Sequence, residues 1–387
     1  MVNDEHLLLL TSYDQKISPS VNVNKKGLII NFSRMNKIER IDTKNLIVHI
    51  QRGVTFEQII PELKKVGVKL NVPAAASSKS VVEQYVNRVI TMRAARYPEV
   101  HVTNMKVVLP DGSIHLTGSH ALSEESSDHK ADGGPDLSKW YLGAEDMYGI
   151  VTRASIWLYP YWDTHKILAF GCNNREDATD FIKDIPRRDL CTMGMALNTK
   201  VVAENIKPET EKLPEWTAVV SVEGNKEIAD YREKTILDLA KNKNLNNISN
   251  LYEDKYEFFE KPLYINDLLK NTGFYCTFDR INEFESIIKD AGYSQDACSQ
   301  YFVSVANGSC VYFNCDFQDI DMDSLINLEL ALSDHGAFFD RPQGKLAESI
   351  YRKLGKPYLA QIQRIKKMVD PGTIINPGIP VTIGEEV

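Results

Sequence analysis

The sequence predicts an α+β protein in which the strands of an antiparallel sheet are joined by helices. Residues 149–159 alternate between apolar and polar side chains, the pattern of a strand with one buried face. Two further apolar segments flank Pro110-Asp111-Gly112, a sequence typical of a hairpin turn. After Pro160 the chain reads as βα, βα and ββα, an order that suits an antiparallel sheet with helices on one face.

The composition permits an ordinary packed core and disfavours some classes of partner. The chain has 387 residues, 43% hydrophobic and 25% charged, enough for two or three domains. Its net charge of −8 disfavours nucleic acid and anionic membranes, because both reward clustered Lys and Arg. No apolar run reaches the ~18 residues of a transmembrane helix, and no secretory signal opens the chain. The six cysteines contain no CxxC pair, so we expect reduced thiols and a cytoplasmic protein.

The first 160 residues combine short strands with one well-marked helix. Apolar runs predict strands at residues 7–10, 27–32 and 46–50. Thr55 precedes a helical segment and Gln58 follows three residues later, as in a capping box. Gly67 is suited to end that helix. Residues 121–138 are polar, with paired serines and glycines, and predict an exposed loop.

The segment after Pro160 has its own strands and helices. Strands are predicted at residues 167–171 and 217–222 and on both sides of Asn307-Gly308 within 301–316. Helices are predicted at residues 175–184, 226–241, 322–335 and 345–369, the last one broken near Gly355. Residues 203–215 and 241–272 are rich in Asn, Lys and Glu, so we expect them to be peripheral.

Two turns with small residues lie far apart in the sequence. Residues 143–152 read Gly-Ala-Glu-Asp-Met-Tyr-Gly-Ile-Val-Thr, and residues 370–378 read Asp-Pro-Gly-Thr-Ile-Ile-Asn-Pro-Gly. Glycine has no Cβ, so such turns let the backbone come close to a flat ligand. We expect the two turns to fold together and to form one slot for that ligand.

The order and spacing of these motifs resemble the vanillyl-alcohol oxidase/p-cresol methylhydroxylase (PCMH-type) superfamily of FAD-linked oxidoreductases. The resemblance also includes Phe32–Asn36, Gly53-Val54-Thr55 and the Val-Leu-Pro-Asp-Gly of the hairpin, and it is nearest to the D-lactate dehydrogenase and glycolate oxidase branch. It implies a PCMH-type FAD-binding domain at residues 1–160 and a cap domain of antiparallel sheet and helices at 161–339. Residues 340–387 would return to the FAD domain.

The resemblance further implies which residues contact a non-covalently bound FAD. The segment from Pro73 to Glu83 would lie along the cofactor, since backbone N–H and serine O–H groups can reach its polar oxygens. With the two turns, the implied contacts are Pro73, Ser77, Ser78, Ser80, Val81, Glu83, Gly143, Ala144, Glu145, Gly149, Ile150, Val151, Asn376, Pro377 and Gly378. Two plainer interpretations stay open, namely that Ser78 or Ser80 caps a helix and that Gly149 starts a strand.

On the substrate side the resemblance points to Arg341, Gln343 and, more weakly, Tyr301 of the cap. A guanidinium at Arg341 would hold a carboxylate in two hydrogen bonds, and the alternative is a surface ion pair with Asp340 or Asp334. Gln343 occupies the place of the histidine base of the hydroxy-acid branch. A glutamine cannot accept a proton usefully near neutral pH, so that branch's usual mechanism is not expected.

Other elements of the family are replaced or absent. The βαβ unit that precedes the family's pyrophosphate loop is missing, so we expect a truncated FAD domain. The loop itself reads Thr11–Ser18 without a glycine, and Asp14 would repel a diphosphate. Ser304–Val311 replaces the branch's histidine-containing metal element, so no metal is expected. No His or Tyr is suitably placed for a covalent flavin link.

Two functions remain open at this stage. The first is an FAD-dependent oxidoreductase that oxidises a small organic substrate and passes electrons to a partner protein. The second is a non-catalytic or helper subunit that keeps the fold, binds FAD weakly or not at all, and docks on a paralogous flavoprotein or on a copy of itself. The colour of the purified protein separates the two, because a bound flavin is yellow.

Overall fold

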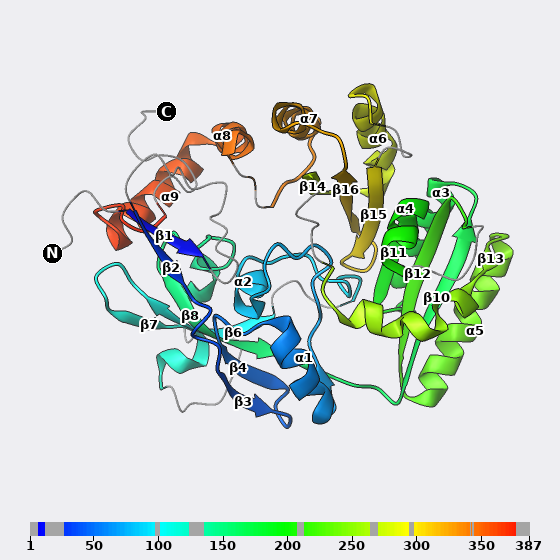
Figure 1. Ribbon diagram of the computed structural model, residues 1–387, viewed down its shortest axis with the longest axis horizontal. Helices are drawn as coiled ribbons and strands as arrows, with labels where there is room; N and C mark the ends of the chain where they lie inside the picture. Colours follow the sequence, from blue (N-terminus) through cyan, green and yellow to red (C-terminus); the bar gives the residue numbers. More distant parts are fainter. Residues whose placement is uncertain are drawn as a thin grey trace.

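The computed structural model describes residues 7–11, 27–96, 101–123, 135–206, 213–263, 270–293, 298–340, 342 and 344–376. As predicted, the described chain is an α+β protein, with two main antiparallel sheets that lie side by side (Figure 1). Within the residues described, no helix is long and apolar enough to cross a membrane.

The smaller main sheet has five strands in the order β3-β4-β8-β6-β7. Their bounds are β3 Ile38–Asp42, β4 Ile47–Gln51, β8 Ile150–Trp157, β6 Val102–Val108 and β7 Ile114–Leu116. Helices α1 (Phe56–Lys65) and α2 (Val81–Val86) lie between β4 and β6 in sequence. The predicted capping box of α1 is confirmed, because Thr55 accepts from the N–H of Gln58 and the Gln58 side chain accepts from the N–H of Thr55.

The larger sheet has seven strands in the order β13-β10-β12-β11-β15-β16-β14. Their bounds are β13 Asn246–Asn247, β10 Thr164–Cys172, β12 Trp216–Gly224, β11 Met193–Asn198, β15 Cys298–Val305, β16 Cys310–Phe317 and β14 Lys270–Cys276. The α-helices of this region are α3 Arg175–Arg187, α4 Thr199–Val201, α5 Lys226–Asn242, α6 Ile281–Asp290 and α7 Met322–Asp334.

The remaining elements are short or follow the sheets. The last helices of the described chain are α8 (Gly344–Lys353) and α9 (Lys356–Val369). Two pairs of strands stand apart, the parallel pair β1 (Leu7–Thr11) with β2 (Gly27–Asn31) and the antiparallel pair β5 (Val68–Lys69) with β9 (Tyr159–Pro160). The other helical segments are η1 Gly118–Ala121, η2 Leu137–Trp140, η3 Val202–Ile206, η4 Ser249–Glu260 and η5 Phe278–Arg280.

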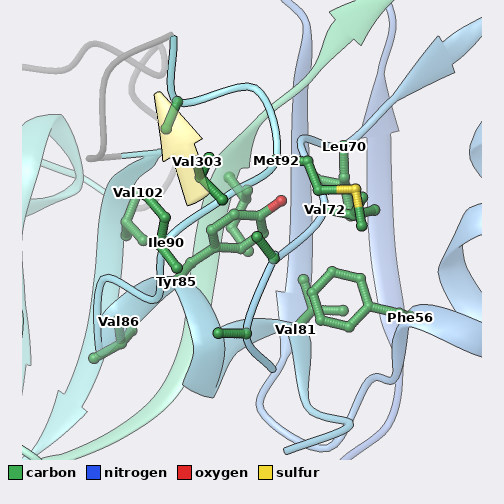
Figure 2. Packing of buried hydrophobic residues seen from close by; sticks show 14 of the residues in the cluster. Phe56, Leu70, Val72, Val81, Tyr85, Val86, Ile90, Met92, Val102 and Val303 are labelled. Carbon is green, nitrogen blue, oxygen red and sulfur yellow. The ribbon is translucent and has the colours of Figure 1, made fainter. Parts of the chain in front are cut away.

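Both faces of the seven-stranded sheet are buried. On one face, Phe302 and Phe313 join a core with the apolar residues of α3, α5, α6 and α7. On the other face, Val303 and Val219 belong to a second core, shared with the five-stranded sheet and with α1 and α2. Figure 2 shows Val303 of β15 in this shared cluster with Ile90 and Met92. Packing of this face against the smaller sheet joins the two halves of the molecule.

Some predicted features differ from the structure. The stretch 241–272 was expected to be peripheral, but Tyr252 and Phe259 of η4 are fully buried. Their aromatic side chains pack into the shared core in spite of the many charged neighbours in the sequence. The sequence analysis also missed strands β3, β11 and β14 and helix α6.

Glu329 of α7 gives a testable pH dependence. Its carboxylate accepts a hydrogen bond of 3.1 Å from the hydroxyl of Thr272 on β14, and burial raises its pKa from 4.5 to about 7. Since the pKa is higher in the folded state, the stability that Glu329 contributes is complete below pH 4.5 and is lost as the pH rises through about 7. We expect E329Q to be more stable than wild type at pH 8 by about 1–3 kcal/mol.

The measurement is urea unfolding of both proteins at several pH values. The difference in unfolding free energy should shrink steadily as the pH falls from 8 toward the ordinary glutamate pKa. A difference that stays constant over this range would contradict the assignment.

Candidate functional site

The turn that begins at Gly143 has an unusual backbone. Gly143 (φ 74°), Glu145 (φ 46°) and Asp146 (φ 60°) all have left-handed conformations. A Cβ on Gly143 would lie 2.6 Å from a guanidinium nitrogen of Arg88, so the side chain of Arg88 covers this glycine. The space that the missing Cβ leaves is therefore used by the protein itself.

Arg52, which directly follows β4, holds this turn through Asp146. Its Nη1 and Nη2 atoms donate to the two carboxylate oxygens at 2.7 and 2.6 Å, and both side chains are buried. The same guanidinium donates to the carbonyl of Val151 at 3.1 Å and lies 4.7 Å from the ring centroid of Phe32. A forked pair of charge-assisted bonds fixes both distance and orientation, so the turn is rigidly attached to the sheet.

The N-terminus of α2 is attached to the same arginine. Ser80 caps the helix, because its hydroxyl oxygen accepts from the N–H of Glu83 at 3.1 Å, and its hydroxyl donates to the carbonyl of Arg52 at 2.5 Å. The hydroxyl of Ser78 donates to the Glu83 carboxylate at 3.1 Å. Burial raises the pKa of Glu83 to about 6, against the lowering effect of Arg52. The capping alternative for Ser80 is thus what the structure has, and it sets the serine beside the turn.

The C-terminal turn reaches the same place through α9. The Nζ atom of Lys366 donates to the carbonyls of Met147 and Ile375 at 2.5 and 2.6 Å, and the lysine is buried. The amide nitrogen of Asn376 donates to the carbonyl of Glu145 at 2.6 Å. The two turns predicted from the sequence therefore meet.

The geometry of the meeting differs from the expected slot. Asn376 bonds directly to Glu145, so no ligand-sized gap separates the turns at this contact. At Gly149 a Cβ would lie 2.7 Å from a methyl of Val107 on β6, so this glycine permits close packing of strands. A ligand would have to lie along the joined edge of the turns and not between them.

The other implied cofactor contacts have mixed surroundings. Pro73 is buried beside Thr91 and accepts from the N–H of Leu263 at 3.0 Å, whereas Ser77 is exposed. Core positions are occupied by Val81, Ala144, Ile150 and Val151. Their cofactor roles stay predictions.

Some of the predicted substrate-side residues lie outside the described part of the chain. Arg341, Gln343, Pro377, Gly378 and residues 12–18 of the expected pyrophosphate loop lie outside the described residues. Tyr301 is described, and its buried hydroxyl donates to the carbonyl of Ala74 at 2.8 Å. Burial raises the pKa of this phenol well above its ordinary value. Tyr301 thus joins the seven-stranded sheet to the segment that begins at Pro73, and a catalytic role for it stays a prediction.

The polar atoms at this site are mainly hydrogen-bond acceptors. The side-chain oxygen of Asn376 is buried and has no partner among the described residues. Glu83, Glu145 and Asp146 add carboxylates, and the guanidinium of Arg52 is already bound to Asp146. Such a set fits the N–H and O–H donors of a flavin ring or its sugar chain, and it does not fit a diphosphate.

Comparison with known proteins identifies the domain and the fold. A family model described as an FAD binding domain matches residues 11–118. The crystal structure of p-cresol methylhydroxylase with substrate bound has a TM-score of 0.78, covering 98% of this chain and 85% of that chain at 16% identity. The chain therefore has the PCMH-type fold. The PCMH-type fold that the sequence predicted is therefore confirmed.

Curated relatives match a part of this chain. A 1'-carboxy-chondrochloren decarboxylase of Chondromyces crocatus is 29% identical over 44% of the chain and 32% of its own length. A glycolate oxidase subunit of Bacillus subtilis (strain 168) is 28% identical over 41% of the chain and 33% of its own length. The chain thus spans about a third of the length of these two relatives. They support the predicted kinship with FAD-linked oxidoreductases, including the glycolate oxidase branch.

Sequence reasoning missed the residues that organise the candidate site. Arg52 lies next to the Gly53-Val54-Thr55 motif and Asp146 lies inside the first turn, but they are 94 positions apart. Lys366 lies in the predicted helix 345–369, and the sequence analysis did not identify its side chain as buried. The available sequence signal was a single charged residue at the border of an apolar segment. Such a residue suggests a buried charge, but it does not indicate which distant residue pairs with it.

The Arg52–Asp146 pair yields a stability prediction. The substitution D146N removes the charge that compensates a buried guanidinium, so we expect a loss of about 3–5 kcal/mol in the free energy of unfolding. The matched control is E39Q, which weakens the more exposed Arg153–Glu39 pair of 3.2 Å and should cost less than about 1 kcal/mol. Equal losses for the two variants in denaturant unfolding would show that the buried pair does not hold the turn.

Proposed function

We propose that this chain binds FAD non-covalently and oxidises a small organic substrate, with the electrons passing to a separate acceptor protein. The observation that carries the proposal is the convergence of three segments at one place. The N-terminus of α2, the Gly143–Gly149 turn and Asn376 meet around Arg52 and Asp146. All three segments were implied as cofactor contacts, and residues 11–118 match an FAD binding domain.

The side chains at this place have definable tasks. FAD, when bound, supplies the acceptor for the hydride that leaves the substrate. The buried amide oxygen of Asn376 accepts a hydrogen bond from the cofactor. Glu83, with a pKa of about 6, can present a protonated or an ionised carboxyl near neutral pH. The hydroxyl of Tyr301 donates to the carbonyl of Ala74 and so attaches β15 to the segment that leads to Ser78 and Ser80.

The proposal extends to the parts that lie outside the described site. We retain residues 1–160 and 340–387 as the FAD domain and 161–339 as the cap, which is supported by strands of the two main sheets lying on either side of Pro160. Arg341 would bind a carboxylate of the substrate beside Gln343, and the glycolate oxidase relative, by its name, acts on a carboxylate. A cytoplasmic location is inferred from composition, and a protein partner from the family resemblance.

A second function is favoured by the charges at the site. The carboxylates of Glu83, Glu145 and Asp146 repel an anionic cofactor, and the charge of Arg52 is already compensated by Asp146, which would weaken the binding of FAD. A chain with this property would act as a helper subunit that keeps the fold and docks on an active flavoprotein. The two functions predict opposite results in a direct test of flavin content.

The test begins with the purified full-length protein. We expect flavin absorption bands at roughly one FAD per chain, and release of unmodified FAD into the supernatant on denaturation, identified by mass spectrometry. Colourless protein that takes up no added FAD would reject the oxidoreductase proposal and support the helper subunit.

A variant tests the proposed contact. The substitution N376A removes both the bond to Glu145 and the free acceptor, so the dissociation constant for FAD should rise about tenfold or more. The control is N45A, because Asn45 is exposed in the turn after β3, donates to Asp42 at 2.9 Å and lies at the opposite end of β4 from Arg52. Fluorescence titration with FAD measures both. Equal affinities for N376A and N45A would exclude Asn376 from the cofactor site.

A further inference from the structure

Four charged side chains lie buried where the two main sheets meet. Lys69 belongs to β5 and Arg93 to the loop after α2, whereas Glu223 belongs to β12 and Glu260 to η4. The exposed fractions of these side chains lie between 0 and 9%. We call these four residues the interdomain tetrad.

Hydrogen bonds and ion pairs link all four residues of the tetrad. One oxygen of Glu223 accepts from Arg93 Nε at 2.9 Å and from Lys69 Nζ at 3.0 Å. Arg93 also donates to the Glu260 carboxylate and, at 3.3 Å, to the carbonyl of Phe259. Lys69 lies 3.5 Å from Glu260. Although burial raises it, Arg93 and Lys69 lower the pKa of Glu223 to about 2. Two cations and two anions therefore form a neutral group without water-exposed members.

Stability alone does not account for such a group. The desolvation of four charges offsets much of their mutual attraction, and apolar residues of similar volume often stabilise a core as well or better. The ionic groups add a fixed relative orientation of the elements that carry them, because each hydrogen bond of a guanidinium or ammonium group has a preferred geometry. Arg93 in particular reaches an anion on each of two different elements of the cap region.

The tetrad is attached to the segment that leads into the proposed cofactor site. The N–H of Arg93 donates to the side chain of Asn71 at 3.1 Å, and the N–H of Met92 donates to the carbonyl of Val72 at 2.9 Å. The N–H of Ala74 donates to the carbonyl of Ile90 at 2.8 Å. Residues 90–93 and 71–74 thus run side by side, and Figure 2 shows Ile90, Met92 and Val72 in one cluster.

The cap region holds the same segment from its other side. Tyr301 donates to the carbonyl of Ala74, and the N–H of Ala76 donates to the carbonyl of Leu263 at 2.7 Å. Beyond Ala76 the chain reaches Ser78 and Ser80 at the proposed site within a few residues. A shift of the tetrad would therefore move the backbone that carries these serines.

We propose that Arg93 and Glu223 are positioning residues, which fix the Pro73–Ala76 segment between the two sheets so that the following serines and Glu83 meet the cofactor. This inference rests on the proposed binding of FAD, and it is independent of the substrate.

The test separates positioning from stability by restoring neutrality. The single variants R93M and E223L leave an unbalanced buried charge and should both lower the free energy of unfolding. In the double variant R93M/E223L the charges of the remaining Lys69 and Glu260 still compensate each other, so the free energy of unfolding should recover toward the wild-type value. The directed contacts do not return, so the dissociation constant for FAD should stay raised by about tenfold.

A second readout does not need the cofactor. Hydrogen exchange at the amides of Ala74 and Ala76 should be faster in R93M/E223L than in wild type, without added FAD. The matched control is R175M/E285L, which removes another largely buried Arg–Glu pair, of 2.7 Å, within the cap region. The control should change neither the FAD affinity nor the exchange of Ala74 and Ala76.

Two outcomes would overturn the inference. Wild-type FAD affinity in a stable R93M/E223L protein would show that the tetrad does not position the site. Unchanged exchange at Ala74 and Ala76 in that protein would show that the segment is held by other contacts. If wild type itself binds no FAD, the proposed function fails, and the exchange result still decides whether the tetrad fixes the segment.

Discussion

The buried ion pair between Arg52 and Asp146 is the constraint on which the candidate site depends. A guanidinium cannot remain uncompensated in the interior, so the turn that carries Asp146 must close onto the end of β4. The carbonyl of the same arginine receives the hydroxyl of Ser80, which fixes the start of α2. The neighbouring carbonyl of Glu145 receives Asn376. One charge pair thus brings together segments that are separated by most of the chain.

Buried cations recur in this protein as organisers of irregular backbone. Turns leave carbonyl groups without partners from regular structure, and a buried carbonyl must be satisfied. Lys366 supplies donors to two carbonyls near the meeting of the turns, and Arg52 supplies one to Val151 at the start of β8. Arg93 does the same for Phe259 at the junction of the sheets. The sheets provide the rigid walls, and these cations determine how the loops between them are arranged.

Local patterns in the sequence were sufficient to predict much of the fold. The capping box at Thr55 and the hairpin of β6 and β7 depend on neighbours within a few positions, and both were predicted. Strand β11 reads Met-Gly-Met-Ala-Leu-Asn, which has no β-branched residue and no alternation because both of its faces are buried. The meeting of the two turns was also predicted, whereas the Arg52–Asp146 pair was not. Complementary charges carry no information about partners 94 positions away.

The two glycines of the first turn have a consequence for how the motif is interpreted. Gly143 lies under Arg88 and Gly149 lies against Val107, so both are required by contacts inside the polypeptide. A descendant that had stopped holding any prosthetic group would still need them to close its strands. The glycine signature therefore indicates the fold. Whether a cofactor is bound is better judged from polar atoms that lack a hydrogen-bond partner within the described protein, such as the amide oxygen of Asn376.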